Sequence, residues 1–336
     1  DNFFDLGGHS FSAIRATAHT ITATGIHIPA TTMFQHPTIH TLAQWIDSNQ
    51  PTDRAIALIQ SGGPLPPLFL VHPVGGNVLC YRELAQRIAP DRPVYGLVAR
   101  GVDTDAVPRE SIEEMARAYL REVTAVTGDD SFCLGGWSMG GLVAYEMAQQ
   151  EHRRTGRQVP VFMIDSFAPS AAGLGEYDDA QTMVDFAGDW AASSGLELDL
   201  KPADVAGLPR QDVVRMVLQR AGLPDTRDAD EAALLDRLLR VYIANTRAIR
   251  GYHPQQAYPG PMFLYAARDN GFDCGDAAHG LGSWTSGRLD ITPVPGDHYS
   301  ILRGDNLSVL AAGLRSALES ILESVLESGP ESGEFK

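Results

Sequence analysis

Ser138 stands between two pairs of glycines in the stretch GGWSMGG, residues 135–141. The five residues Gly136 to Gly140 fit the pattern G-x-S-x-G, in which a strand turns sharply into a helix and lifts a serine hydroxyl clear of a sheet. Such a turn strains the backbone at the serine and crowds the adjacent chain, so the two flanking glycines must lack side chains. The preceding SFCLGG is typical of a strand and the following GLVAYEMAQQ of a helix. The pattern therefore favours a nucleophilic Ser138 over a purely structural turn.

A serine hydroxyl is a weak nucleophile at neutral pH and needs a base that an acid holds in place. Behind a G-x-S-x-G turn the partners follow in the order Ser, Asp or Glu, His. His298 fits this order best, because it lies in LDITPVPGDHYSIL after the last predicted strand and before the final predicted helix. The other histidines fit less well: His9 and His19 fall in N-terminal helices, His152 on a charged helix, and His253 and His279 in loops.

Two aspartates compete for the role of the acid. Asp165 ends VFMID, the strand directly after the helix of the nucleophile, and Asp269 ends MFLYAARD, a later strand. The later position is the more general one in α/β-hydrolases, yet either residue could reach His298. Asp297 adjoins the base and is poorly placed to orient it. The pattern of residues leaves Asp165 and Asp269 open.

The stretch LFLVHPVGGN, residues 68–77, predicts a strand followed by a glycine-rich turn. In a hydrolase of this type, the loop after such a strand supplies one backbone amide to the oxyanion and the residue after the nucleophile supplies another. We therefore predict an oxyanion hole from the N–H groups of Val74 and Met139. A phosphate-binding loop of the G-x-x-x-x-G-K type is excluded, since no lysine follows. His72 is interpreted as positional, and no metal site is predicted.

The elements that must position these residues alternate between strand and helix, which predicts an α/β fold with a mostly parallel sheet and helices on both faces. No strand is expected between Asp165 and Pro261, only helical segments, and we interpret about residues 170–255 as a lid over the site. The predicted strands are AIALIQ, LFLVH, VYGLVA, SFCLGG, VFMID, MFLYAA and LDITPV, and the predicted helices between them lie near 78–89, 111–127 and 140–155.

The composition narrows the class of protein. A chain of 336 residues with 44% hydrophobic residues can form more than one domain, and its net charge of −16 argues against a nucleic-acid partner. Three widely spaced cysteines favour a reduced, cytoplasmic protein, and no stretch reaches membrane-spanning length. We divide the chain into a helical domain (1–48), a polar linker (49–54), an α/β domain (55–326) and a tail (327–336).

The N-terminal stretch DNFFDLGGHS resembles the phosphopantetheine attachment motif of peptidyl carrier domains in nonribosomal peptide synthetases. The resemblance implies that Ser10 carries a covalent 4′-phosphopantetheine added by a phosphopantetheinyl transferase. Without it, Ser10 would be interpreted as the N-cap of a helix, a role it can also fill. A carrier domain is a four-helix bundle, and this stretch matches from just before the second helix.

Residues from about 55 to 326 resemble the thioesterase that ends such assembly lines, through LFLVHPVGGNVLCYRELAQRI, GGWSMGGLVAYEMAQQ, FMIDSFAP and GDHYSIL. In that family the acid lies directly after the nucleophile helix and the lid follows it, which implies Asp165 rather than Asp269. The resemblance also implies an α/β-hydrolase fold, upstream synthetase domains, and release of a carrier-bound peptide by hydrolysis or macrocyclisation. The alternatives are an esterase or lipase-like hydrolase with an unrelated helical appendage, and a catalytically idle binding module.

Overall fold

The chain was analysed as a computed structural model that describes residues 1–8, 10–48, 55–88, 90–128, 130–170, 178–193, 196–221, 229–269 and 276–327. The predicted linker, 49–54, and residues 328–336 of the predicted tail lie outside the described residues.

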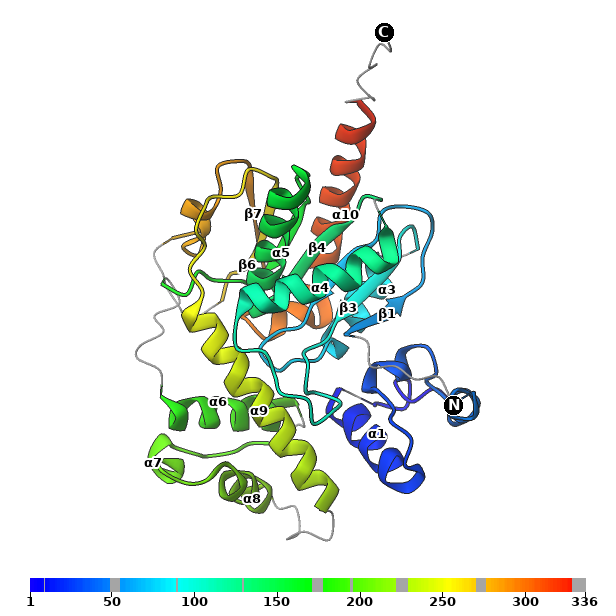
Figure 1. Ribbon diagram of the computed structural model, residues 1–336, viewed down its shortest axis with the longest axis vertical. Helices are drawn as coiled ribbons and strands as arrows, with labels where there is room; N and C mark the ends of the chain where they lie inside the picture. The colour runs from blue at the N-terminus through cyan, green and yellow to red at the C-terminus, as the bar shows by residue number, and fades with distance from the viewer. Residues whose placement is uncertain are drawn as a thin grey trace.

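A seven-stranded sheet forms the centre of the α/β domain, in the order β1-β3-β2-β4-β5-β6-β7 (Figure 1). Strand β1 is antiparallel to β3, and every other neighbouring pair is parallel. Each of the predicted strands is present. Their bounds are Ile56–Gln60 (β1), Leu68–Val71 (β2), Val94–Leu97 (β3), Cys133–Trp137 (β4), Val161–Ile164 (β5), Met262–Ala267 (β6) and Leu289–Val294 (β7).

Helices cover both faces of the sheet because its central strands are apolar on both sides. In β2, Leu68 and Leu70 face one buried cluster, and Phe69 and Val71 face the other. Helices α3 and α10 pack in the first cluster, and α4 and α5 pack in the second. These helices span Arg82–Ile88 (α3), Ile112–Thr127 (α4), Met139–Thr155 (α5) and Gly304–Glu327 (α10), with short 3₁₀ turns at Leu79–Tyr81 (η2), Leu281–Trp284 (η3) and Ser300–Leu302 (η4).

Between β5 and β6 the chain leaves the sheet and forms helices, which we call the helical insert. Its helices, between residues 179 and 251, fall within the predicted lid of about residues 170–255, and the elements described in that interval are helical, as expected. In Figure 1 the insert, green to yellow, lies beyond one end of the sheet. The four helices are Asp179–Ser193 (α6), Pro202–Val205 (α7), Arg210–Arg220 (α8) and Ala229–Gly251 (α9).

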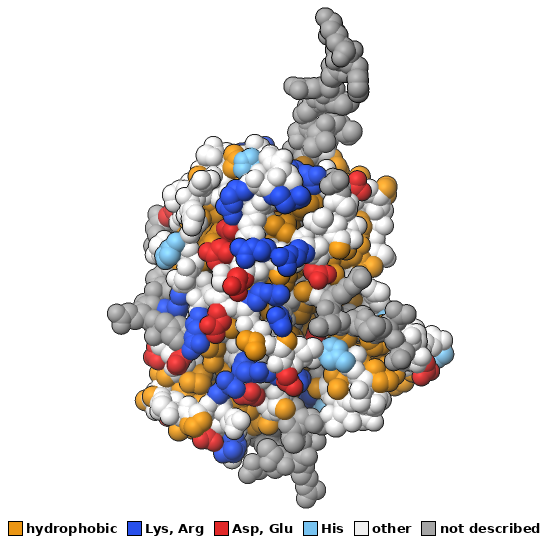
Figure 2. All heavy atoms as spheres, viewed as in Figure 1, with side chains coloured by type: hydrophobic (Ala, Val, Ile, Leu, Met, Phe, Trp, Pro, Cys, Tyr) orange, Lys and Arg blue, Asp and Glu red, His pale blue; other side chains and the backbone are white. Residues whose placement is uncertain are grey.

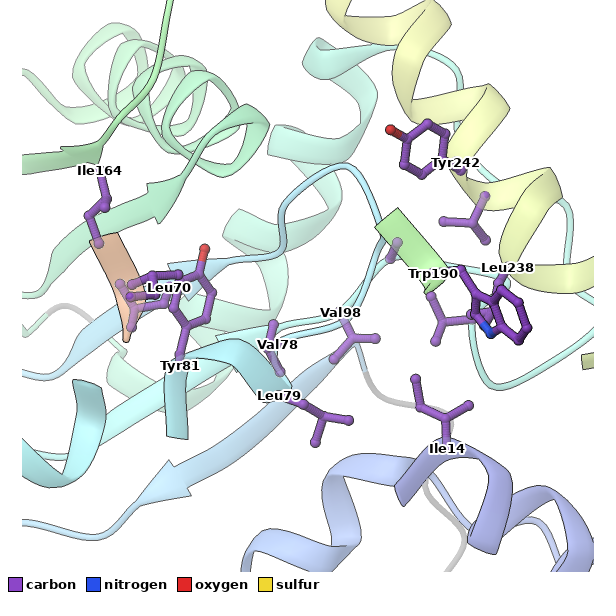
Figure 3. Close-up of a cluster of buried hydrophobic side chains, with 14 of the residues drawn as sticks. Ile14, Leu70, Val78, Leu79, Tyr81, Val98, Ile164, Trp190, Leu238 and Tyr242 are labelled. Atoms are coloured by element: carbon purple, nitrogen blue, oxygen red, sulfur yellow. The ribbon is translucent and has the colours of Figure 1, made fainter. Parts of the chain in front are cut away.

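The N-terminal region consists of α1 (Ser10–Thr24), η1 (Ala30–Phe34) and α2 (Ile39–Asp47). Helix α1 contacts α9 and α6 of the helical insert. Ile14 is 4% exposed and belongs to the same buried cluster as Trp190 and Leu238. Figure 3 shows Ile14 pointing from α1 toward these insert residues and Leu79. By contrast Ile39, the first residue of α2, is 90% exposed.

Basic and acidic side chains are interleaved on the face of the molecule shown in Figure 2. Arg153 is 3.0 Å from Glu146, and Arg247 is 3.4 Å from Glu110. These arginines are therefore paired with carboxylates rather than gathered into a purely basic patch. No helix in the described ranges is long and apolar enough to cross a membrane.

Candidate active site

Ser138 occupies the turn between β4 and α5, with φ 57° and ψ −124°. A positive φ at a residue other than glycine is strained, and such strain collects at functional sites. The neighbouring glycines permit the turn: a Cβ at Gly136 would collide with the backbone of Gly140, and a Cβ at Gly140 would collide with the carbonyl oxygen of Val71. The structure thus explains why the sequence has no side chains at these two positions.

Hydrogen bonds from three elements hold this turn. The Ser138 N–H donates to the Ile164 carbonyl at 2.9 Å, and the Ser166 hydroxyl donates to the Ser138 carbonyl at 2.8 Å. The Tyr81 hydroxyl accepts the Trp137 N–H at 2.7 Å. Because all of these partners are fully buried or lie beside fully buried strands, the turn has little freedom to relax.

Asp165 and His298, which are 133 residues apart, form a hydrogen bond of 2.6 Å between Oδ2 and Nδ1. Asp165 is fully buried, while the His298 side chain keeps 25% exposure. The other carboxylate oxygen of Asp165, Oδ1, accepts the backbone N–H of Ala267 at 2.8 Å. A bond at Nδ1 orients the imidazole and leaves Nε2 available for proton transfer.

The loop of His298 is attached to the nucleophile turn through Trp137, the residue directly before Ser138. The Trp137 indole Nε1 donates to the His298 carbonyl at 3.0 Å, and the two rings lie 5.1 Å apart between centroids. Asp165 is also attached to this turn, because its two neighbours in the sequence, Ile164 and Ser166, are the residues that bond Ser138. Ser138 and Asp165 directly follow β4 and β5, and His298 lies in the loop after β7, so all three lie at the carboxyl end of the parallel strands.

Asp269, the other candidate acid, is exposed and bonds to a different part of the histidine loop. Its carboxylate accepts the Gly296 N–H at 3.0 Å, and its own N–H donates to the Gly296 carbonyl at 3.0 Å. The Asp297 carboxylate accepts the N–H and hydroxyl of Ser300 and the N–H of Tyr299, and these bonds hold its pKa below the usual range. Both aspartates shape the loop that carries His298, and Asp165 is the one bonded to the imidazole.

The two predicted oxyanion amides belong to Val74, after β2, and Met139, at the start of α5. Within the described parts of the chain neither N–H donates to a backbone carbonyl. The Val74 carbonyl accepts the Asn245 side-chain Nδ2 at 2.8 Å, so α9 of the helical insert holds this loop. Asn245 itself is only 1% exposed. The two amides are thus unused by the surrounding backbone, as donors for a ligand must be.

Two other histidines near the site have structural surroundings. His72 is fully buried between the Pro73 carbonyl and the Tyr119 hydroxyl, each at 2.8 Å, and burial lowers its pKa to about 4. His279 has a positive φ of 52° and stacks on Phe167 with 4.0 Å between ring centroids.

Several residues that shape the site are absent from the sequence-based prediction. Tyr81 and Ser166 hold the turn of Ser138, and Asn245 holds the loop of Val74. Ser166 could have been suspected because it follows Asp165 directly. Tyr81 and Asn245 lie in helical segments with no local motif, so the sequence carried no signal for them.

Ser10 is the first residue of α1, and the described turn at residues 3–8 precedes it. In that turn the Gly8 N–H donates to the Phe3 carbonyl at 3.0 Å. The first turn of α1 contains no acidic residue, so its partial positive charge is not offset by a carboxylate. A phosphate ester at Ser10 fits this environment electrostatically. By contrast, no group of three or more potential metal ligands occurs in the part of the chain that the structure describes.

Comparisons with known proteins divide the chain into two domains. Residues 66–317 match the family model of the thioesterase domain, and residues 1–46 match that of the phosphopantetheine attachment site. The alternative of a hydrolase with an unrelated helical appendage is therefore wrong, because the N-terminal helices match the attachment-site family.

Two relatives are nonribosomal peptide synthetases. A dimodular synthase from Bacillus subtilis is 29% identical over 79% of this chain, and the synthetase btyA from Aspergillus terreus is 30% identical over 90% of it. The chain spans 11% and 34% of the lengths of these relatives.

Solved structures show the same architecture. A four-domain nonribosomal peptide synthetase, crystallised in its holo form with AMP and glycine, is similar over 94% of this chain and 24% of its own, with a TM-score of 0.73 and 30% identity. The Vlm2 thioesterase domain, 22% identical, shares the fold over 77% of this chain and 95% of its own with a TM-score of 0.54. Because the thioesterase model matches well over half of the sequence, this chain belongs to the thioesterase domain family, with a phosphopantetheine attachment domain before it.

Proposed function

We propose that this chain releases a peptide from a nonribosomal peptide synthetase, by moving it from a thioester on its own carrier domain to Ser138 and then to a second nucleophile. The observation that carries the proposal is the 2.6 Å bond between a fully buried Asp165 and His298, beside the strained turn of Ser138. The resemblance to synthetases supports a peptidyl substrate, and the attachment-site match supports delivery in cis.

In the first half of the reaction, His298 Nε2 accepts the proton of the Ser138 hydroxyl as Ser138 Oγ attacks the thioester carbonyl carbon. Asp165 keeps the imidazole oriented and stabilises its positive charge. The N–H groups of Val74 and Met139 donate to the oxygen that becomes negative. The carbon–sulfur bond then breaks, and His298 returns the proton to the departing thiolate, which leaves an ester on Ser138.

In the second half, His298 takes a proton from the incoming nucleophile, which attacks the ester carbonyl. Water gives a free acid, and an amine or hydroxyl of the same peptide gives a macrocycle. The carbon–oxygen bond to Ser138 breaks, and the imidazolium restores the serine hydroxyl. Exclusion of water by the helical insert would favour the cyclic product. Asn245, which joins α9 to the Val74 loop, would connect the position of the insert to the oxyanion site.

Ser10 would hold the 4′-phosphopantetheine as a phosphate ester, and the group supplies a thiol on a long arm that carries the acyl chain. Positions 10, 14 and 17 share one face of α1, since residues four and seven apart lie on the same side of a helix. Ile14 and Thr17 on that face are buried, with 4% and 3% exposure. The face of α1 that carries Ile14 therefore packs on the helical insert.

A second set of contacts would keep the carrier domain in this orientation. The Asp103 carboxylate accepts the Ala30 N–H at 3.3 Å, and the Asp103 carbonyl lies 2.8 Å from His27 Nε2. Arg82 stacks over the Phe4 ring at 4.2 Å. These contacts join the N-terminal region to two separate segments of the thioesterase domain, the loop after β3 and helix α3.

A soluble acyl-pantetheine thioester and a fluorophosphonate probe test the proposal together. We expect the unchanged chain to hydrolyse the thioester and to be labelled once, at Ser138. The Ser138→Ala variant should lose both properties, and Ser316→Ala, which removes an exposed serine hydroxyl of α10, should keep both. Labelling that persists in Ser138→Ala would contradict the assignment of the nucleophile. Loading with a phosphopantetheinyl transferase, followed by mass spectrometry, should place the arm on Ser10 and not on Ser12.

A further inference from the structure

A carboxylate of the helical insert is hydrogen-bonded to the residue next to His298. Asp189 of α6 accepts the Tyr299 hydroxyl at Oδ1, at 2.9 Å, and the Tyr242 hydroxyl at Oδ2, at 3.0 Å. Tyr242 belongs to α9, and Tyr299 directly follows His298. One carboxylate thus joins two helices of the insert to the loop of the proposed catalytic base.

Asp189 is half-buried on α6, and its bond to the exposed Tyr299 lies nearer the surface than its bond to the buried Tyr242. Burial raises its pKa, and the hydrogen bonds from the two tyrosines oppose that rise. No arginine or lysine lies within ion-pair distance of Asp189 in the described ranges. The charged groups that act on it are Asp185, one helical turn earlier, and His298 when protonated.

Tyr299 connects this carboxylate to the site physically. Its ring packs edge-on against the His298 ring, with centroids 5.3 Å apart, and against the Trp137 ring at 6.2 Å. Trp137 in turn bonds the His298 carbonyl and directly precedes Ser138. A displacement of Tyr299 would therefore move both the His298 ring and the turn that carries Ser138.

We propose that Asp189 is a positioning residue for His298, which it ties to the helical insert through the hydroxyls of Tyr299 and Tyr242. The proposal rests on the proposed roles of Ser138, Asp165 and His298. Asp189 holds the histidine loop when the insert is packed on it, and its negative charge favours the imidazolium that forms as Ser138 attacks. Asp165 orients the imidazole by bonding it directly, whereas Asp189 makes the position of the histidine loop depend on the position of the helical insert.

The test compares Asp189→Asn with the unchanged chain, using hydrolysis of a soluble acyl-pantetheine thioester between pH 5 and 9. The asparagine keeps the size of the side chain but removes the charge and one of the two acceptors. We expect kcat to fall about tenfold, as for the loss of one hydrogen bond to a charged group. The acidic limb of kcat/KM should move about half a unit to lower pH, because a negative charge that favours the protonated imidazole has gone.

Two control variants separate this effect from general damage. Asp185→Asn removes the same charge from an exposed position one turn away on α6, and Tyr252→Phe removes a tyrosine–carboxylate bond of 2.8 Å to Glu146, away from the histidine loop. Both should keep kcat within about twofold, and neither should move the acidic limb. A fall of kcat in Asp189→Asn with an unmoved limb would mean a structural role only and would overturn the proposal, as would unchanged kinetics.

Tyr299→Phe keeps the test decisive if Asp189→Asn does not fold. This variant should have a lower kcat than the unchanged chain. Its α6 amides should also exchange hydrogen for deuterium faster, when both proteins are measured without phosphopantetheine on Ser10. Unchanged exchange in α6 would refute the connection. Failure of the proposed function would be seen separately, as absence of thioester hydrolysis or of Ser138 labelling in the unchanged chain.

Discussion

The Tyr81 hydroxyl accepts the backbone N–H of Trp137 at 2.7 Å and donates to the Val71 carbonyl at the same distance. Trp137 is the last residue of β4 and Val71 the last of β2, so one buried side chain closes the ends of two neighbouring parallel strands. Ser138 follows at once. The strained turn is therefore held, through the residue that precedes it, by a side chain more than fifty positions earlier in the sequence.

Replacement of Tyr81 by phenylalanine removes both hydrogen bonds and leaves a buried N–H and carbonyl without this partner. We expect the free energy of unfolding to fall by about 1–3 kcal/mol and kcat to fall about tenfold, because Ser138 loses its fixed position. Thermal unfolding and hydrolysis of a soluble thioester measure the two effects. Tyr95→Phe, at a tyrosine whose ring stacks on Phe69, should change neither by a comparable amount. A fully active Tyr81→Phe would show that the turn needs no such support.

Asp165→Asn and Asp269→Asn distinguish the two candidate acids. Asparagine at 165 would no longer stabilise the imidazolium, and kcat should fall by about three to four orders of magnitude. Asparagine at 269 weakens only the bond to Gly296 and should leave most of the activity. Both variants need the same control, a thermal unfolding curve, since Asp165 is fully buried. A larger loss from Asp269→Asn would reverse our assignment.

Ile14→Asp tests whether the packing of α1 on the helical insert serves delivery. A carboxylate among Leu79, Trp190 and Leu238 is costly, so the carrier domain should separate from the insert. We expect release of an acyl group loaded on Ser10 to slow by about ten- to a hundredfold, with hydrolysis of a soluble thioester unchanged.

The matched control for this experiment is Ile39→Asp, the same change at an isoleucine of the same domain that is 90% exposed. It should alter neither rate. Faster hydrogen–deuterium exchange of α1 in Ile14→Asp, measured before loading, would demonstrate the separation independently of activity. Equal slowing of the tethered and soluble substrates would argue against a docking role.

The buried His72 predicts a dependence of stability on pH. Its pKa is lowered to about 4 in the folded chain, against an ordinary value of 6.5, because burial disfavours the charged ring. Between these pH values the unfolded chain binds a proton at His72 that the folded chain does not. The free energy of unfolding is therefore highest above pH 6.5 and falls as the pH drops toward 4. The full loss amounts to about 3 kcal/mol.

Chemical denaturation at pH 7 and pH 4 measures this loss in the unchanged chain and in His72→Gln. The variant should lose about 3 kcal/mol less than the unchanged chain over that interval. His253→Gln, at an exposed histidine, should behave as the unchanged chain does. Equal losses in His72→Gln and the unchanged chain would show that His72 does not titrate in this way.

The amino-acid sequence determined the elements of the fold and most of the residues of the proposed site. The alternation of short apolar runs with helical segments predicted every strand of the sheet, because central parallel strands must be apolar on both faces. Gly136, Ser138 and Gly140 are recognisable because the constraint that selects them is local: a turn too tight for side chains. Ser10 is recognised differently, through the resemblance of DNFFDLGGHS to the attachment motif of carrier domains.

Only the tertiary structure decided which distant side chains meet. The sequence pattern left Asp165 and Asp269 equivalent, since both follow strands at the same end of the sheet, and only in the folded chain does the Asp165 carboxylate bond the His298 imidazole. Tyr81, Asn245 and Asp189 carry no local signal, because a hydrogen bond across the fold imposes no spacing along the chain. Their partners are fixed by how helices pack on the sheet, and packing is a property of the folded chain as a whole.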